Sequence, residues 1–348
     1  MPVSLTASSP GKIILFGEHA VNRQQPAIAT AVDLRVFCRA TTRDDEVYTF
    51  CSKPHKETCD RESLMAFKKE VDRLRSTSAF DDIRERARDF FAPARYVLAH
   101  VIERVDCPGL DIEWKSPLPI GSGLGSGAAA STAMVLASME SSGYHPKPDE
   151  IAFLAWQGDY IAHGGIASSL DSGTCAYGGL IKYTVAEGPE PLPFGMSLPL
   201  VIGDTQVQKN TATINTYVRK WLEAHPARIH LFRDIGYLVQ QAVRALETGD
   251  LTTLGQLMNI HQLIQEKIGT SCREIENLIE ASIGAGALGA KISGSGGGGI
   301  IIALADYDHQ AKVADAIEKA GGRSMAVKAG AEGTHIEPYE SWKNVFYQ

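Results

Sequence analysis

The first part of the chain shows the hydrophobic pattern of β-strands. Residues 12–18 (KIILFGE) and 31–43 (AVDLRVFCRATTR) are rich in β-branched and other apolar residues, and the turn-prone NRQQP at 22–26 lies between them. Residues 109–116 (GLDIEWKS) predict a further strand. We therefore expect the chain to begin with a β-sheet.

The pattern changes after residue 60. Leu64, Phe67, Val71 and Leu74 recur every three or four positions within the charge-rich stretch 60–92, which is the spacing of one helix face. Charged residues fill most of the other positions. We interpret this stretch as a solvated helical excursion whose charges need no functional explanation.

Helices and strands then alternate to the end of the chain. Helices are predicted over 94–105, 128–143, 147–165, 213–225 and 230–249, and Gly143 is placed to end the second of them. Pro and Gly cluster at 185–199, a strand follows at 200–204, and a glycine-rich hairpin is expected over 289–305. The sequence thus predicts an α+β fold with two domains, residues 1–190 and 191–348.

Composition narrows the class of protein. Of the 348 residues, 44% are hydrophobic and 22% charged, as in ordinary globular proteins, and the net charge of −7 argues against broad binding to nucleic acid or an anionic membrane. We expect neither a signal peptide nor a membrane helix, since no apolar run approaches about 18 residues. The six cysteines form no CxxC pair, which favours reduced thiols in the cytoplasm.

The glycine-rich stretch PLPIGSGLGSGAAAS at 117–131 follows a predicted strand and leads into a helix near Ser126. A helix start offers unbonded N–H groups and partial positive charge, and glycines let the backbone approach an anion closely. An ordinary glycine turn with Ser126 as the N-cap explains this segment alone equally well. The candidate phosphate-binding residues are Gly121, Ser122, Gly123, Leu124, Gly125, Ser126 and Gly127.

A second glycine cluster lies at 289–305 and contains a literal GxGxxG at Gly294, Gly296 and Gly299. That fingerprint must open a helix to bind a dinucleotide, whereas Gly299 leads into the strand-like IIIALA. No GxxxxGK[ST] occurs, so the common P-loop is excluded as well.

Three segments together carry a family resemblance. SPGKIILFGEHAV at 9–21, PIGSGLGSGAA at 119–129 and GALGAKISGSGGGG at 286–299 resemble the three motifs of the GHMP kinases, the superfamily of galactokinase, homoserine kinase, mevalonate kinase and phosphomevalonate kinase. The resemblance is strongest to the mevalonate kinase family and covers nearly all of the chain except 60–92. It implies phosphorylation of the primary hydroxyl of mevalonate by ATP with Mg²⁺. It also implies an N-terminal mixed-sheet nucleotide domain, a C-terminal ferredoxin-like α/β layer and, in many members, a homodimer.

The resemblance also implies catalytic roles. Asp171, in HGGIASSLDSGTCAYGG, matches the family aspartate beside the acceptor hydroxyl, and Lys12 matches its neighbouring lysine. A carboxylate can accept the hydroxyl proton, and an ammonium group keeps that carboxylate ionised. Taken alone, Asp171 would be a turn residue and Lys12 a surface lysine. One extra residue separates His163 from Asp171 compared with the family spacing.

The family's metal contacts match this sequence only in part. Asp159, on the predicted helix before Asp171, matches the acidic metal ligand. Gly127 stands where the family has a metal-binding serine, which leaves Ser126, water or the phosphates to complete the Mg²⁺ shell.

The acceptor is expected to meet residues of both domains. The positions that match the family's acceptor side are Glu18, His19, Lys209, Thr211 and Gly296. A polar turn after a buried strand explains Glu18 and His19 nearly as well. Other readings stay open: a kinase for phosphomevalonate, a sugar or another small alcohol, a related decarboxylase, or a non-catalytic ATP-binding sensor.

Overall fold

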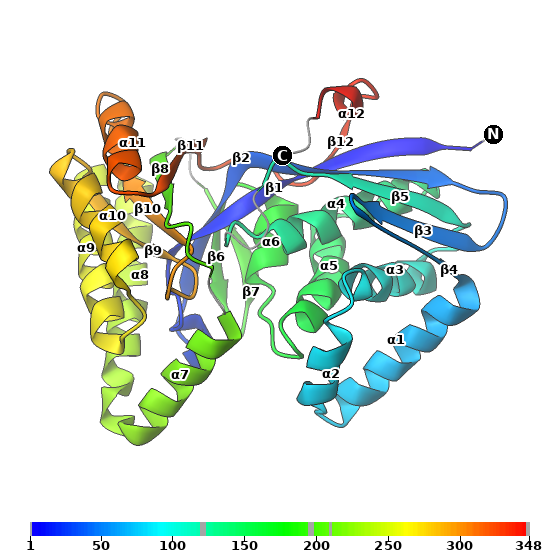
Figure 1. The fold of residues 1–348 in the computed structure, drawn as a ribbon, viewed down its shortest axis with the longest axis horizontal. Coiled ribbons are helices and arrows are strands. Elements are labelled where there is room, and N and C mark those ends of the chain that lie inside the picture. Colours follow the sequence, from blue (N-terminus) through cyan, green and yellow to red (C-terminus); the bar gives the residue numbers. More distant parts are fainter. Residues whose placement is uncertain (1, 119–122, 194–197, 209–210, 346–348) are drawn as a thin grey trace.

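The computed structural model describes residues 2–118, 123–193, 198–208 and 211–345 and contains two β-sheets with helices packed against them (Figure 1). The larger sheet runs in the order β12-β1-β2-β5-β3-β4, and β6 and β7 extend it from β2. Its pairs are antiparallel among the described strands except β3 with β5, so the sheet is mixed. Its strands are β1 (Ser4–Phe16), β2 (Ala27–Thr42), β3 (Val47–Ser52), β4 (His55–Asp60), β5 (Leu110–Lys115), β6 (Leu180–Thr184), β7 (Gly188–Leu192) and β12 (His335–Glu337).

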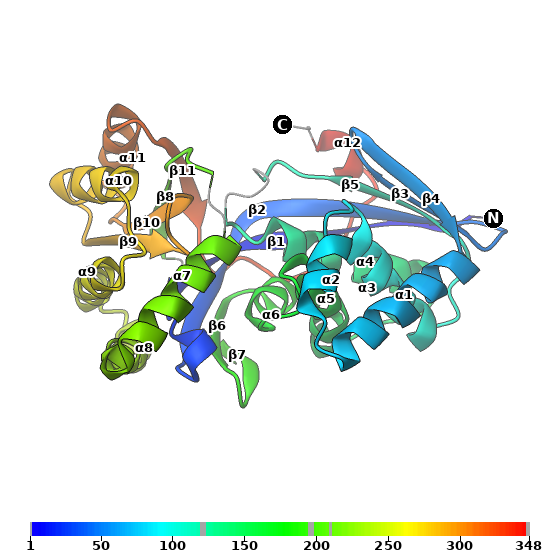
Figure 2. The ribbon, with the colours of Figure 1, turned by 60° about the horizontal axis from the view of Figure 1, so that its bottom comes forward.

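Helices cover one face of this sheet, as the turned view in Figure 2 shows. Helix α4 packs directly on β1 and β2 and is buried on nearly all sides, which explains its alanine-rich sequence. Helices α3, α5 and α6 surround α4, and α1 and α2 lie outside them. Their bounds are α1 (Arg61–Ser76), α2 (Phe80–Arg86), α3 (Ala92–Arg104), α4 (Ser126–Ser141), α5 (Pro148–Ala162) and α6 (Leu170–Tyr177).

The smaller sheet has the antiparallel order β11-β8-β10-β9. Numbered along the chain, this order is 4-1-3-2 with helices after the first and third strands, so the predicted ferredoxin-like layer is confirmed. Its strands are β8 (Pro199–Asp204), β9 (Gly289–Ser293), β10 (Ile300–Leu304) and β11 (Arg323–Lys328). The helices are α7 (Thr211–Ala224), α8 (His230–Thr248), α9 (Leu251–Ile268), α10 (Arg273–Gly284) and α11 (Gln310–Lys319), with short helices at Val21–Arg23, Pro226–Ile229 and Ser341–Asn344 (α12).

Strand alternation decides how the smaller sheet packs. Val201 and Ile301 point into a core shared with α10 and α11, whereas Leu200, Ile202 and Ile300 join the main core with α8, α9 and the larger sheet. One face of the smaller sheet is therefore turned toward the rest of the molecule. The end of the chain also joins the two parts, because β12 pairs with β1. The predicted domain boundary at residue 190 stays a prediction.

The stretch 60–92 forms α1 and α2, as predicted, and many of its charges are paired. Lys68, for example, is buried and contacts Asp72 at 2.6 Å and Glu103 at 3.0 Å. Among the described residues, no helix is both long and apolar enough to span a bilayer. All six cysteines are free.

Candidate active site

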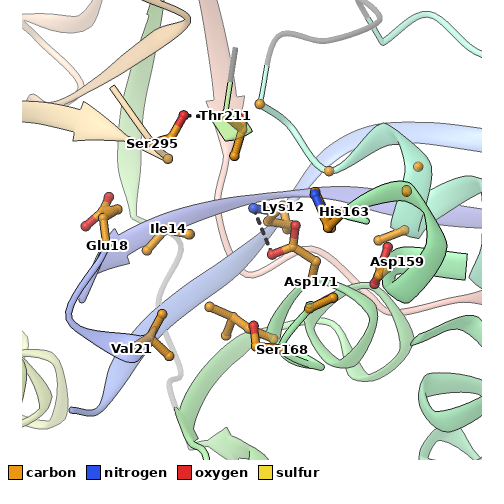
Figure 3. Close-up of a pocket in the computed structure, with 18 of the residues that line it drawn as sticks. Lys12, Ile14, Glu18, Val21, Asp159, His163, Ser168, Asp171, Thr211 and Ser295 are labelled. Carbon is orange, nitrogen blue, oxygen red and sulfur yellow. Dashed lines mark hydrogen bonds and ion pairs between the residues drawn. The ribbon is translucent and has the colours of Figure 1, made fainter. Parts of the chain in front are cut away.

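A cavity of about 340 Å³ opens where β1, the start of α4, the α5–α6 segment and the loop after β9 meet (Figure 3). Its size lies within the range of small-molecule sites. Each of these elements contributes polar groups, among them Lys12, Ser126, Asp159, Asp171 and Ser295. The site thus lies between the larger sheet and the smaller one.

The floor of the cavity includes the start of α4. Gly125 holds the N-cap position with φ +70, a left-handed conformation that favours glycine, and no side chain caps the helix. The alternative in which Ser126 is an ordinary N-cap is therefore wrong, because Ser126 is already the first residue of the helix. Uncapped N–H groups at the positive end of a 16-residue helix suit a phosphate.

Strand β1 is bonded to this helix start. The Lys12 N–H donates to the Leu124 carbonyl at 2.8 Å, next to a break in the β1–β2 register between Pro10 and Gly11. A Cβ on Gly125 would lie 2.7 Å from Cγ of Lys12, so the lysine side chain crosses directly over the helix start. The loop at 123–125 and Lys12 are consequently placed by the same local contacts.

Lys12 points from β1 to Asp171 in the first turn of α6. Its Nζ lies 2.9 Å from Oδ1 of Asp171, and the pair is drawn in Figure 3. The Lys12 side chain is 6% exposed, whereas that of Asp171 is 26% exposed and faces the cavity. The carboxylate of Asp171 is therefore held beside an ammonium group and open to the cavity, where it can accept a proton from a bound hydroxyl.

Asp159 lies behind this pair on α5 and is buried. Burial raises the pKa of Asp159 well above its usual value; the charge of Asp171 adds to this, while Lys12 and hydrogen bonds from Ser172 oppose it. Its Oδ2 has no hydrogen-bond partner among the described residues. A cation bound here would stabilise the neighbouring carboxylates of Asp159 and Asp171 and would give Oδ2 of Asp159 a partner.

The surroundings of Asp159 fit Mg²⁺ bound together with a nucleotide. Ser126 brings a hydroxyl to the same cavity, whereas Gly127 has open space where a side chain would be. The described residues contain no group of three or more His, Cys, Asp or Glu side chains that could hold a metal alone. Mg²⁺ is commonly bound by one or two protein oxygens plus phosphates and water, which agrees with this sparse donor set.

On the opposite side, polar groups from both parts of the molecule meet. The His19 Nε2–H donates to the Ser295 carbonyl at 2.8 Å, and the Ser295 hydroxyl lies 3.3 Å from that of Thr211. Glu18 is buried, and its Oε1 accepts a hydrogen bond from Nζ of Lys291 at 2.5 Å. Glu18, His19 and Thr211 therefore all border the cavity.

Comparisons with known proteins agree with this geometry. The family model for the GHMP kinases N-terminal domain matches residues 93–179, and that for the GHMP kinases C-terminal domain matches 242–323. A mevalonate kinase of Pyrococcus horikoshii is 35% identical over 95% of this chain and 97% of its own length. The chain belongs to the mevalonate kinase family of GHMP kinases.

Two further mevalonate kinases extend this similarity within the family. That of Pyrococcus abyssi is 33% identical over 97% of this chain and 99% of its own length. The crystal structure of L. major mevalonate kinase in complex with R-mevalonate has a TM-score of 0.72 at 26% identity and covers 94% of this chain and 96% of that one. As a GHMP kinase, the protein is a phosphotransferase that acts on an alcohol group.

The cavity lining accounts for only part of the predicted set of site residues. Gly121, Ser122 and Lys209 are outside the described residues. A Cβ on Gly296 would lie 2.1 Å from the Thr270 carbonyl, so Gly296 allows a close backbone contact after α9, and Ser295 with its neighbour Gly294 borders the cavity instead.

Sequence reasoning missed several side chains of this GHMP kinase site. His163 and Ser168 border the cavity from the segment between α5 and α6, as does Ile166, which is 66% exposed. The signal was present, because all three lie in the segment HGGIASSLD that leads to Asp171. Lys291 lies in the glycine-rich stretch 286–299, and no spacing in the sequence marks it as a partner of Glu18.

Proposed function

We propose that this protein phosphorylates the primary hydroxyl of mevalonate with ATP and releases 5-phosphomevalonate and ADP. The observation that carries this proposal is the Lys12–Asp171 pair, which faces a cavity next to an uncapped helix start. Membership of the mevalonate kinase family supports mevalonate as the acceptor.

The chain's own groups suit phosphoryl transfer, which depends mainly on positioning and charge neutralisation. The N–H groups at 123–127 would bind the phosphates of ATP. Asp171 would orient the acceptor hydroxyl and take its proton as the oxygen attacks the γ-phosphorus, while the bond to the ADP oxygen breaks. Lys12 would hold the Asp171 carboxylate in place and stabilise negative charge on the attacking oxygen.

Mg²⁺ would be held by Asp159 and Ser126 together with the phosphates of ATP. When bound, the ion supplies positive charge that neutralises the phosphate oxygens. The unpartnered Oδ2 of Asp159 supports this assignment. Location in the cytoplasm and assembly into a homodimer stay predictions.

A coupled assay of ADP formation with an acceptor panel tests the proposal. The panel contains mevalonate, phosphomevalonate, galactose and other hexoses, and mass spectrometry identifies each product. We expect turnover with mevalonate well above the ATPase background and above that with the other acceptors. Preferred turnover of phosphomevalonate or a hexose would replace mevalonate as the substrate, and release of CO₂ would indicate a decarboxylase. ATP binding without turnover of any acceptor would indicate a sensor.

A further inference from the structure

Alternate residues of β9 and its following loop connect the smaller sheet to the end of β1. Ala290 and Ile292 point into the core with α10 and α11. The side chains of the next residues turn the other way: Lys291 contacts Glu18, and the Ser293 hydroxyl exchanges hydrogen bonds with the backbone of Ile14 at 3.0 and 3.1 Å. Further along the loop, the backbone carbonyl of Ser295 accepts a hydrogen bond from the His19 ring. Side chains therefore join the two sheets at the edge of the cavity.

Lys291 and Glu18 form the most deeply buried of these contacts. Their side chains are 0% and 1% exposed, although Glu18 borders the cavity. Lys291 donates from Nζ to Oε1 of Glu18 and to the Ile292 carbonyl. Oε2 of Glu18 has no hydrogen-bond partner among the described residues. A buried ion pair of this kind adds little net stability, but losing one partner leaves a costly unpaired charge.

The other groups around Glu18 leave Lys291 as its main source of positive charge. Nε2 of His261 on α9 lies 3.7 Å from Oε2 of Glu18, and burial, together with Lys291 and His19, lowers the pKa of His261 well below its usual value. Burial and these charges therefore favour the neutral imidazole of His261. Gln265, also on α9, donates to the Glu18 carbonyl at 3.4 Å.

The turn after β1 depends on these contacts. His19 has φ +60, an uncommon conformation for a residue with a side chain, and its ring is bonded to the loop after β9. Neighbouring positions 18 and 19 are thus both held by residues of the segment 291–295. A shift of this segment would move both side chains relative to Asp171.

We propose that Lys291 is a positioning residue for the acceptor: through Glu18 it fixes the 18–19 turn at the side of the cavity where mevalonate is expected to bind. This inference rests on the proposed function. It also gives the third motif, residues 286–299, a role beyond that of its glycines. This motif connects the smaller sheet to the acceptor side of the site.

Steady-state kinetics of Lys291→Met tests the inference. We expect the KM for mevalonate to rise about tenfold or more, because small misplacements near reacting groups have large kinetic effects, while the KM for ATP stays within about twofold of wild type. Lys68→Met is the matched control, since Lys68 is also buried and paired but lies on α1, away from the cavity. This control should lose stability without any change in the KM for mevalonate.

A double variant separates positioning from folding. Glu18→Gln combined with Lys291→Met removes both buried charges, so it should be more stable than Lys291→Met alone while its KM for mevalonate stays raised. If the single variant does not fold, the double variant is compared with Glu18→Gln alone, and an equal KM for mevalonate in the two supports an action of Lys291 through Glu18. A KM for mevalonate within about twofold of wild type in the folded variant would overturn the inference.

The pH profile shows whether Lys291 acts through Glu18. Burial raises the pKa of Glu18, and Lys291 opposes this rise, so its loss should raise the pKa further. The acid limb of kcat/KM for mevalonate should then shift to higher pH in Lys291→Met and stay in place in Lys68→Met. Superimposable profiles for wild type and Lys291→Met would contradict a role through Glu18. Wild type without mevalonate turnover would instead count against the proposed function.

Discussion

Two lysine–carboxylate pairs lie on opposite sides of one cavity, and their surroundings differ. Lys12 and Asp171 are joined at 2.9 Å with the carboxylate 26% exposed, whereas Lys291 and Glu18 are joined at 2.5 Å with both side chains almost fully buried. The first pair has an open side from which a substrate hydroxyl can reach the carboxylate. The second is enclosed by α9, β9 and the end of β1. The same two residue types therefore suit chemistry in one place and positioning in the other.

Asp171→Asn should have the largest effect. An amide cannot accept the hydroxyl proton, so kcat should fall about a thousandfold or more, while ATP binding measured by calorimetry is retained. Asp81→Asn is the control, because Asp81 lies on α2 with its side chain 96% exposed and should leave kcat unchanged. A kcat within about tenfold of wild type would remove Asp171 from the chemistry.

Lys12→Met should have the next largest effect. We expect kcat to fall about a hundredfold, because one preorganised cationic donor near the developing charge is lost. Because Asp171 keeps access to water, we expect the free energy of unfolding to change less than in Lys291→Met. Thermal unfolding of the two variants side by side checks this order. A larger loss of stability from Lys12→Met would contradict the contrast between the open and the enclosed pair.

Asp159→Asn should weaken Mg²⁺ binding about tenfold or more, seen as a higher Mg²⁺ requirement in the coupled assay.

The same substitution should raise, and not lower, the folding stability of the protein without Mg²⁺ at higher pH. The raised pKa of Asp159 means that the folded state binds more protons than the unfolded state between the ordinary aspartate pKa and the raised one, so stability without Mg²⁺ falls as pH rises through that window. The variant should lack this part of the fall. If the unfolding free energy fell with pH as steeply in Asp159→Asn as in the wild type, this prediction would be contradicted.

Gly127→Ser should have the smallest effect. Nothing lies within 4 Å of a Cβ at this position, which is in the first turn of α4, so a serine fits without displacement. We expect the free energy of unfolding to change by no more than about 0.5 kcal/mol and Mg²⁺ affinity to rise, as titration of activity with Mg²⁺ would show. Loss of ATP binding would mean that the backbone here needs glycine.

The sequence predicts the elements well because their apolar periodicity is local. The strands predicted at 12–18 and 31–43 overlap β1 and β2, which both begin earlier, at Ser4 and Ala27, and helix α4 begins at Ser126 as expected. The family resemblance also brings Lys12 and Asp171 together as candidates, although they are far apart in the chain. These predictions need no knowledge of packing between distant residues.

What the sequence leaves out depends on tertiary packing. The sequence predicts a solvated stretch at 60–92, yet Arg84 and Phe80 of α2 pack against Gly164 and Gly165, within the segment 163–171 that borders the cavity. The partnership of Lys291 with Glu18 joins residues 273 positions apart. Neither contact has a periodic signal, because each joins residues that lie far apart in the sequence.

The most direct test of the central claim is a crystal structure with a non-hydrolysable ATP analogue, Mg²⁺ and mevalonate. We predict the phosphates against the backbone at 123–127, with the primary hydroxyl of mevalonate within about 3.2 Å of the Asp171 carboxylate. A triphosphate bound away from the start of α4, or a hydroxyl out of reach of Asp171, would contradict the account.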